Sequence, residues 1–233
     1  MRMTAKHATN TSLRAGILGL TLLAMVSIAR PALAGPPLLC HPFDIGAAKS
    51  LPWSGASSWF DGQPGYDLQQ LADDTEALLT PSTPIIVRME TLRRAAIYAS
   101  RDPRVAKRLF LTINDRVRAA AASRGKTDPL TLFDAGYLTE TFREIGRLGR
   151  SSFFAANMNA DAMEALVKDV DGYALVQKSL ALRANDASIE LASALIAAST
   201  PDRKGQYAQH AEKARSGAKQ DALLARNLKH ISN

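Results

Sequence analysis

Four times in this chain, a residue type that commonly caps helices stands directly before a proline. The side-chain oxygen of such a residue accepts a free backbone N–H at the start of a helix, and proline at the first helical position gives up no hydrogen bond that the helix needs. We therefore expect a helix to begin at each of these pairs, which are Thr83-Pro84, Asp102-Pro103, Asp128-Pro129 and Thr200-Pro201.

The spacing of apolar residues predicts an all-α fold. After Pro84, for example, Ile85, Met89, Leu92 and Ala96 fall on one helical face. The chain also carries 40 alanines, which favour helices, and no strand pattern competes. We expect antiparallel helix hairpins, repeat-like or in a bundle. Besides the four helices that begin at the proline pairs, we expect helices at about 67–79, 160–183, 186–199 and 218–231.

Two places are expected to interrupt the helices. Pro103 disfavours helical geometry at Asp102, so residues 84–123 should form two helices hinged at 100–103. Gly172 is expected to break or bend the helix at 160–183. The loop at 146–158 contains Gly and Ser and could separate two helical halves.

The run from Ala181 to Ala187 (ALRANDA), followed by Ala192, resembles the junction between helices in tetratricopeptide-like repeat proteins. In those repeats a helix ends in Ala-Leu, a short Asn/Asp turn follows, and small residues stand at the close contact of the next helix. The resemblance covers about 60 residues at the C-terminal end. It implies stacked helix hairpins and a scaffold or binding role, and it names no ligand.

The first 34 residues have the three-part pattern of a secretory signal. A basic segment is followed by an apolar run from Ala15 to Ile28, and Ala32-Leu33-Ala34 supplies small residues for cleavage. An uncleaved anchor is one alternative, and a lipoprotein acylated at Cys40 is another, although the run is short for a membrane span. Cleavage removes four basic residues and no acid, so the formal charge falls from +7 to +3. We expect a periplasmic or extracellular protein with no transmembrane span after cleavage.

Residues 35–66 differ in composition from the rest of the chain. They hold five of the eleven prolines, five glycines and both tryptophans. Proline density argues against a helix, whereas the aromatic content argues against a disordered tail. We expect an extended arm held against a single helical domain at 67–233. Its expected anchors are Phe43, Trp53, Trp59 and Phe60.

The arm also contains the only cysteine, in the run Cys40-His41-Pro42-Phe43-Asp44. One cysteine excludes an intrachain disulfide scaffold and a structural zinc site made of cysteines alone. Cys40, His41 and Asp44 are candidate ligands for zinc or copper, since thiolate, imidazole and carboxylate all bind these ions. There are three alternatives for Cys40. It could simply be buried in the arm, it could have a redox role or form an intermolecular disulfide, or it could take part in catalysis. No resident cofactor is expected.

Residues 88–126 carry eleven Lys and Arg against three acids. Such a segment could attract an anionic partner, such as an acidic protein or an envelope component, through Arg94, Arg101, Arg104 and Arg108. Nucleic acid is not expected outside the cytoplasm. The alternatives are a solvated helix surface and an internal partner in the acidic stretch 61–76.

No catalytic residue is assigned from the sequence. Glu140 and Glu144 share one helical face with Asp134 nearby, but the flanking Arg143 and Arg147 suggest an ordinary surface. The sequence favours a non-enzymatic interaction or scaffold protein. The alternatives are an envelope protein that binds a metal or small ligand through Cys40 and His41, and an enzyme of unrecognised type.

Overall fold

The computed structural model describes residues 36–54, 59–124, 127–149 and 158–231. All of them belong to one compact unit, Pro31–Asn233. The predicted signal peptide at 1–34 and most of the predicted loop at 146–158 lie outside the described residues. Within the described part of the chain, no helix combines the length and apolar character that a membrane span requires.

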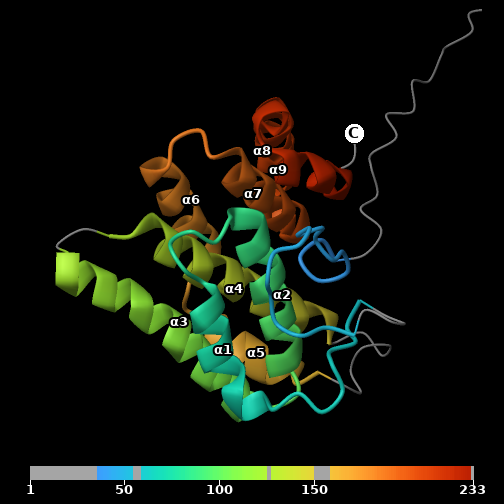
Figure 1. Ribbon diagram of the computed structural model, residues 1–233, viewed down its shortest axis with the longest axis vertical. Helices are drawn as coiled ribbons and strands as arrows, with labels where there is room; N and C mark the ends of the chain where they lie inside the picture. The colour runs from blue at the N-terminus through green and yellow to red at the C-terminus, as the bar shows by residue number, and fades with distance from the viewer. Residues whose placement is uncertain (1–35, 55–58, 125–126, 150–157, 232–233) are drawn as a thin grey trace, which may run out of the picture. The chain divides into compact units, whose positions relative to one another are not determined.

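The all-α prediction is confirmed (Figure 1). In the described residues the one β-type pairing outside helices is an isolated bridge between Trp53 and Gly62. The α-helices are α1 (Leu71–Leu78), α2 (Ile85–Ala99), α3 (Pro103–Arg124), α4 (Pro129–Leu148), α5 (Ala160–Val167), α6 (Gly172–Leu182), α7 (Ala187–Ser199), α8 (Lys204–Gly217) and α9 (Ala222–Asn227). Short 3₁₀ turns, named η1 to η4, lie at Leu68–Gln70, Pro201–Arg203, Ala218–Gln220 and Leu228–His230.

Two of the four predicted helix caps are confirmed. Asp102 accepts the Arg104 N–H at 2.8 Å, and Asp128 accepts the Leu130 N–H at 3.1 Å. The other two are wrong. The Thr83 hydroxyl instead donates to the Leu78 carbonyl at 2.7 Å, at the end of α1, and Thr200 makes no side-chain cap before the 3₁₀ turn that precedes α8.

The predicted interruption of the helix at 160–183 is confirmed at Gly172, between α5 and α6. Asp171 caps the new helix by accepting the Ala174 N–H, so α6 begins at Gly172. Gly172 packs against Gly136 of α4 so closely that a Cβ on Gly172 would lie 2.6 Å from the Gly136 carbonyl oxygen. Glycine at both positions therefore lets α4 and α6 approach each other.

The predicted helix at 218–231 is wrong in its extent. The structure places three short pieces there, η3, α9 and η4. Asp221 adopts extended backbone and caps α9 by accepting the N–H groups of Leu223 and Leu224. The break between α2 and α3 at 100–102, by contrast, is where Pro103 predicts it.

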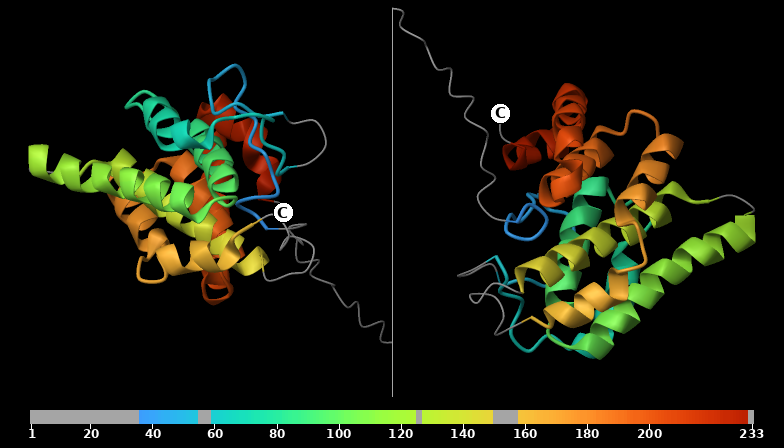
Figure 2. Two further views of the ribbon diagram at one scale, coloured as in Figure 1. Left: turned by 90° about the horizontal axis from the view of Figure 1, so that it is seen from below. Right: turned by 180° about the vertical axis from the view of Figure 1, so that it is seen from behind.

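The core forms around α2 and α4. Every residue of α2 except Arg94 is buried. α4 packs against α2, α3, α5 and α6, and α7 packs against α8. Figure 2 shows the remaining helices around this pair from two further sides. Such complete burial of α2 means that its charged residues must find partners inside the protein.

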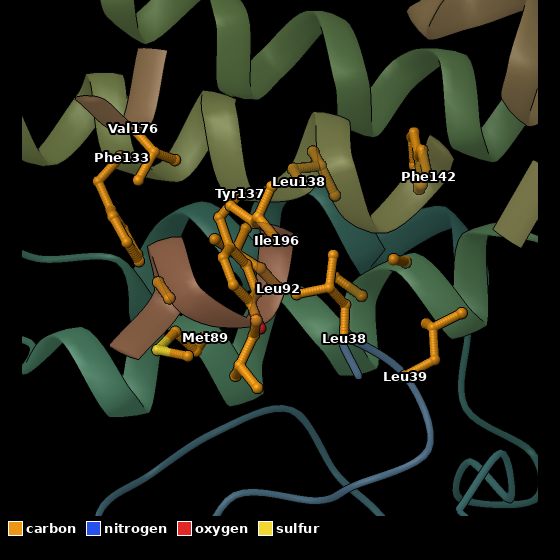
Figure 3. Packing of buried hydrophobic residues seen from close by; sticks show 14 of the residues in the cluster. Leu38, Leu39, Met89, Leu92, Phe133, Tyr137, Leu138, Phe142, Val176 and Ile196 are labelled. Atoms are coloured by element: carbon orange, nitrogen blue, oxygen red, sulfur yellow. The ribbon is translucent and has the colours of Figure 1, made fainter. Parts of the chain in front are cut away.

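The segment 36–54 contributes directly to the core. Leu38 and Leu39 are fully buried, and Phe43 and Leu51 are nearly so. Figure 3 shows Leu38 and Leu39 lying in the same cluster as Leu92 of α2 and Phe142 of α4. We call residues 36–54 and 59–66 the arm.

Candidate functional site

The first charge cluster lies between α2 and α4 and is internal. Arg88 is fully buried and donates to Asp134 at 2.6 Å, and Arg116 of α3 donates to the same oxygen at 3.0 Å. Arg88 also donates to the Thr83 carbonyl at 3.0 Å, and Arg116 to the Leu79 carbonyl at 2.8 Å. These two arginines therefore join α2, α3 and α4 to the loop between α1 and α2.

The second cluster, also on α2, binds the arm. The carboxylate of Glu90 accepts from Arg93 at 2.8 and 2.9 Å and from Arg94 at 2.7 Å. It also accepts the backbone N–H of Phe43 in the arm at 3.0 Å. Burial opposes the ionisation of Glu90, but the hydrogen bonds and charges of Arg93 and Arg94 outweigh it and lower its pKa.

The same arginines bind carbonyl groups of the arm. Arg93 donates to the carbonyls of Leu39 and Trp59, each at 3.0 Å, and Arg94 donates to the Leu51 carbonyl at 2.6 Å. The hydroxyl of Tyr98, one helical turn further on, donates to the Pro52 carbonyl at 2.7 Å and accepts the Gln63 N–H at 2.6 Å. We call Glu90, Arg93, Arg94 and Tyr98 the α2 clamp. It holds the arm mainly through backbone groups.

The four predicted arm anchors differ in their burial. Phe43 is buried, whereas Trp53, Trp59 and Phe60 are partly buried and pack against the core. The Trp53 ring meets Tyr98 edge-on at 5.6 Å, and the guanidinium of Arg93 lies over it at 5.1 Å. Cation–π contacts of this kind add to the hydrogen bonds of the α2 clamp.

The predicted basic face is divided between two environments. Arg94 belongs to the α2 clamp and has a side chain only 17% exposed, whereas the side chain of Arg104 is 91% exposed. Arg101 is exposed and lies near the arm, with a nitrogen 3.4 Å from the Phe60 carbonyl. Lys107 is exposed as well. The first half of α3 therefore presents positive charge to solvent.

Beside these cations lies a pocket of about 250 Å³, between η1, α1 and α3. Arg104 and Arg108 border it, and Leu68, Ala72 and Val105 supply apolar walls. Arg108 is already held by Asp73 at 2.8 Å and by the Gln69 carbonyl at 2.9 Å. The acidic stretch thus orients Arg108, whereas Arg104 pairs with Asp102 at 3.3 Å and remains largely exposed. We call Arg101, Arg104, Lys107 and Arg108 the outer α3 surface.

The predicted metal candidates do not converge. Among the described residues, no group of three or more His, Cys, Asp and Glu side chains could hold a metal ion. Burial, and then the charge of Glu144, raise the pKa of the Cys40 thiol to about 12, which disfavours the thiolate that binds metals or attacks substrates. Asp44 accepts the Gly46 N–H and lies 3.9 Å from Arg226. His41 instead lies beside His230.

The interpretation of Glu140 and Glu144 as an ordinary surface is wrong. Glu140 is fully buried, pairs with Arg143 and accepts the Tyr173 N–H at 3.0 Å. Glu144 is also buried and accepts the Leu38 N–H of the arm at 2.9 Å. Both carboxylates therefore serve contacts with segments distant in the sequence, which the local charge pattern does not reveal.

A further buried network was not predicted from the sequence. The Tyr173 hydroxyl lies 2.7 Å from His210 Nε2, and His210 Nδ1 lies 2.5 Å from Glu190. Lys213 approaches the other oxygen of Glu190 at 3.2 Å. The three elements involved, α6, α7 and α8, bring these residues together only on folding, so no local motif marks them. Tyr173 and His210 are both buried, and neither borders the pockets beside α6 and α8.

No family model matches this chain, and no curated protein or solved structure is significantly similar to it. A function for this chain can therefore be proposed only from its own sequence and geometry.

Proposed function

We propose that this protein is a non-enzymatic helical interaction module that binds an acidic protein segment through the outer α3 surface. We further propose that it acts in the periplasm or outside the cell, as the pattern of residues 1–34 indicates. The main observation behind this proposal is that the basic residues of α2 and those of α3 lie in different environments. Those of α2 are used inside the protein, whereas Arg104 on α3 is 91% exposed beside a pocket.

The chemistry of the pocket favours an acidic protein segment over a bare anion. A guanidinium can bind a carboxylate through two parallel hydrogen bonds. The apolar walls at Leu68, Ala72 and Val105 could at the same time cover carbon atoms of a partner side chain. Of the predicted basic face, the proposal keeps Arg101, Arg104 and Arg108. It leaves out Arg94, whose guanidinium is bound by Glu90 and the Leu51 carbonyl.

The buried titratable groups favour a structural role rather than catalysis. Arg93, Glu90 and Glu144 bind the arm, and Glu140 binds the start of α6. Each of these groups is engaged with the backbone of another segment. The resemblance of residues 181–187 to tetratricopeptide-like helix junctions agrees with an interaction role and stays a prediction.

The test is the binding of a labelled peptide rich in Glu and Asp, followed by fluorescence anisotropy. The double variant Arg104→Glu/Lys107→Glu should weaken binding by about tenfold or more, since each exposed ion pair is worth up to about 1 kcal/mol and reversal adds repulsion. Added salt should weaken binding to the natural protein, because exposed charges are screened.

The matched control is Lys178→Glu/Lys204→Glu, which changes the net charge equally at exposed positions of α6 and α8. Binding should survive in this control. Equal losses in both double variants would show that only net charge matters and would contradict a defined surface. Binding to vesicles with anionic headgroups, without binding to the peptide, would assign the partner to the envelope lipid instead.

A further inference from the structure

Two histidines from opposite ends of the described chain meet in the folded protein. His41 lies in the arm, and His230 ends the 3₁₀ turn η4. Their ring centres are 5.7 Å apart, with the ring planes inclined at 47°. Neither residue is part of the outer α3 surface, so a role for this pair does not depend on the proposed function.

Both rings carry a nitrogen that lacks a hydrogen-bond partner. Among the described residues, Nε2 of His41 and Nε2 of His230 are buried and make no hydrogen bond. His230 as a whole is only 6% exposed. A buried polar atom without a partner is unfavourable and is uncommon in folded proteins. Two such atoms on adjacent rings suggest that a common ligand satisfies both.

The surroundings hold the two rings in place. Asn227, one turn before His230, donates to the Asp44 carbonyl and accepts the Asp44 N–H, each at 2.9 Å. The ring of Phe43 meets that of His230 at 5.0 Å, close to edge-on. The arm and the C-terminal turn are thus joined next to the histidine pair, which helps to hold the two residues in position.

The separation of the rings suits a shared metal ion. An ion held by two imidazole nitrogens alone, each about 2.0–2.1 Å away, has a nearly linear bond angle and places the ring centres about 6 to 6.5 Å apart. The separation of 5.7 Å is slightly shorter, so binding would move the rings apart by about 0.5 Å.

We propose that His41 and His230 together bind one copper(I) ion through their Nε2 atoms. Imidazole is a good ligand for copper. Copper(I) is stable with only two nitrogen donors, whereas zinc in proteins usually takes three or four protein ligands. Among the described residues, no third His, Cys, Asp or Glu side chain joins His41 and His230 to complete a metal site. Two donors favour copper(I) over zinc. The bound ion would link the arm to the C-terminal turn.

The experiment is an anaerobic titration of the metal-free protein, produced without a histidine tag, with copper(I) against a colorimetric copper(I) chelator. The natural protein should bind one equivalent. His41→Gln and His230→Gln should each weaken binding by at least about 10–100-fold, which is the loss expected even for a residue that only supports a ligand. Cys40→Ser is the matched control and should bind as the natural protein does, because the thiol is not a ligand in this proposal.

Thermal unfolding supplies the second readout. A ligand that binds only the folded state raises the midpoint of unfolding. Copper(I) should therefore raise it in the natural protein and in Cys40→Ser, but not in His41→Gln. His41 is only partly buried, so this variant should fold even if His230→Gln does not, and circular dichroism checks the helical content of each.

Three results would overturn the proposal. The first is that the natural protein fails to bind copper(I) stoichiometrically. The second is that binding persists in both histidine variants, and the third is that Cys40→Ser abolishes binding. Stoichiometric binding of zinc in place of copper(I) would likewise overturn the choice of ion.

Discussion

Glu144 lies where the arm meets α4, and its surroundings give it an unusual titration. Burial raises its pKa from the ordinary 4.5 to about 8, against the opposing effects of Arg147 and of the Leu38 N–H. Between these pH values the folded protein holds a proton that the unfolded chain has released. The group therefore stabilises the fold fully below about pH 4.5, and this stabilisation is lost as the pH rises to about 8.

We predict that Glu144→Gln removes this dependence. The difference in unfolding free energy between the variant and the natural protein should change by about 1.4 kcal/mol per pH unit from pH 4.5 to 8, in favour of the variant at the higher pH. Glutamine keeps an oxygen that can accept the Leu38 N–H. Urea unfolding at a series of pH values measures the difference, which also cancels the titration of His230. A difference that does not vary with pH would show that Glu144 is ionised normally in the folded state.

Cys40 should react slowly in the folded protein. Its pKa, raised from 9.0 to about 12 by burial and then by Glu144, lowers the thiolate fraction near neutral pH by about three orders of magnitude. We predict that iodoacetamide labels Cys40 far more slowly in buffer than in concentrated urea, after correction for the reagent's own rate. Similar rates in the two conditions would mean that residues 36–40 are not packed against α2 and α4.

At the residue scale, the sequence predicted which side chains carry charge but not where they point. Arg143 and Arg147 beside Glu140 and Glu144 look like a solvated helix surface. In the folded protein, however, the arm covers Glu144. Its hydrogen-bond partner, the Leu38 N–H, lies 106 residues away in the sequence. His41 and His230 are likewise far apart in the sequence and meet only in the folded protein. Local periodicity carries no information about such distant partners.

At the scale of elements, the contact between α4 and α6 depends on two glycines. A Cβ on Gly172 would lie 2.6 Å from the Gly136 carbonyl and 2.8 Å from the Thr139 Cβ, both on a rigid helix. Neither neighbour is the end of a flexible side chain, so the helices would have to move apart.

We predict that Gly172→Ala destabilises the protein by about 1–3 kcal/mol through overpacking. The control is Gly205→Ala in α8, where an added Cβ meets nothing within 4 Å. This variant should stabilise the protein by up to about 1 kcal/mol, because alanine favours a helix more than glycine does. Urea unfolding measures both. Equal effects of the two variants would contradict the close approach of α4 and α6.

We also predict that the α2 clamp contributes strongly to the stability of the fold. Arg93→Met removes an ion pair with buried Glu90 and the hydrogen bonds to the carbonyls of Leu39 and Trp59, so we expect a loss of about 3–5 kcal/mol. Arg101→Met, at an exposed position, should cost no more than about 0.5 kcal/mol. Urea unfolding followed by tryptophan fluorescence measures both changes. A small loss in Arg93→Met would show that the arm is held by apolar burial alone.

The elements that could be predicted are those with strong local signals. Asp102 and Asp128, each before a proline, mark the starts of α3 and α4 correctly. Gly172 likewise interrupts the helix at 160–183 as predicted. Thr83 fails as a cap because its hydroxyl donates to the Leu78 carbonyl, so a competing partner outweighs the local preference.

At the scale of the whole molecule, one basic segment is divided between two environments. The arginines of α2 bind the arm and α4 inside the protein. Arg104 and Lys107 of the outer α3 surface are exposed to solvent. The sequence showed the excess of positive charge in residues 88–126, but only the fold divides it between interior and surface.

The central claim is that the arm is an integral part of the fold, held by buried polar groups of α2 and α4. Hydrogen exchange of individual amides tests it most directly, since the Phe43 and Leu38 N–H groups donate to the buried carboxyl groups of Glu90 and Glu144. We predict that both amides exchange as slowly as those in the interior of α2, through global unfolding. Exchange of Phe43 and Leu38 at the rate of an unstructured peptide, while α2 stays protected, would contradict the claim.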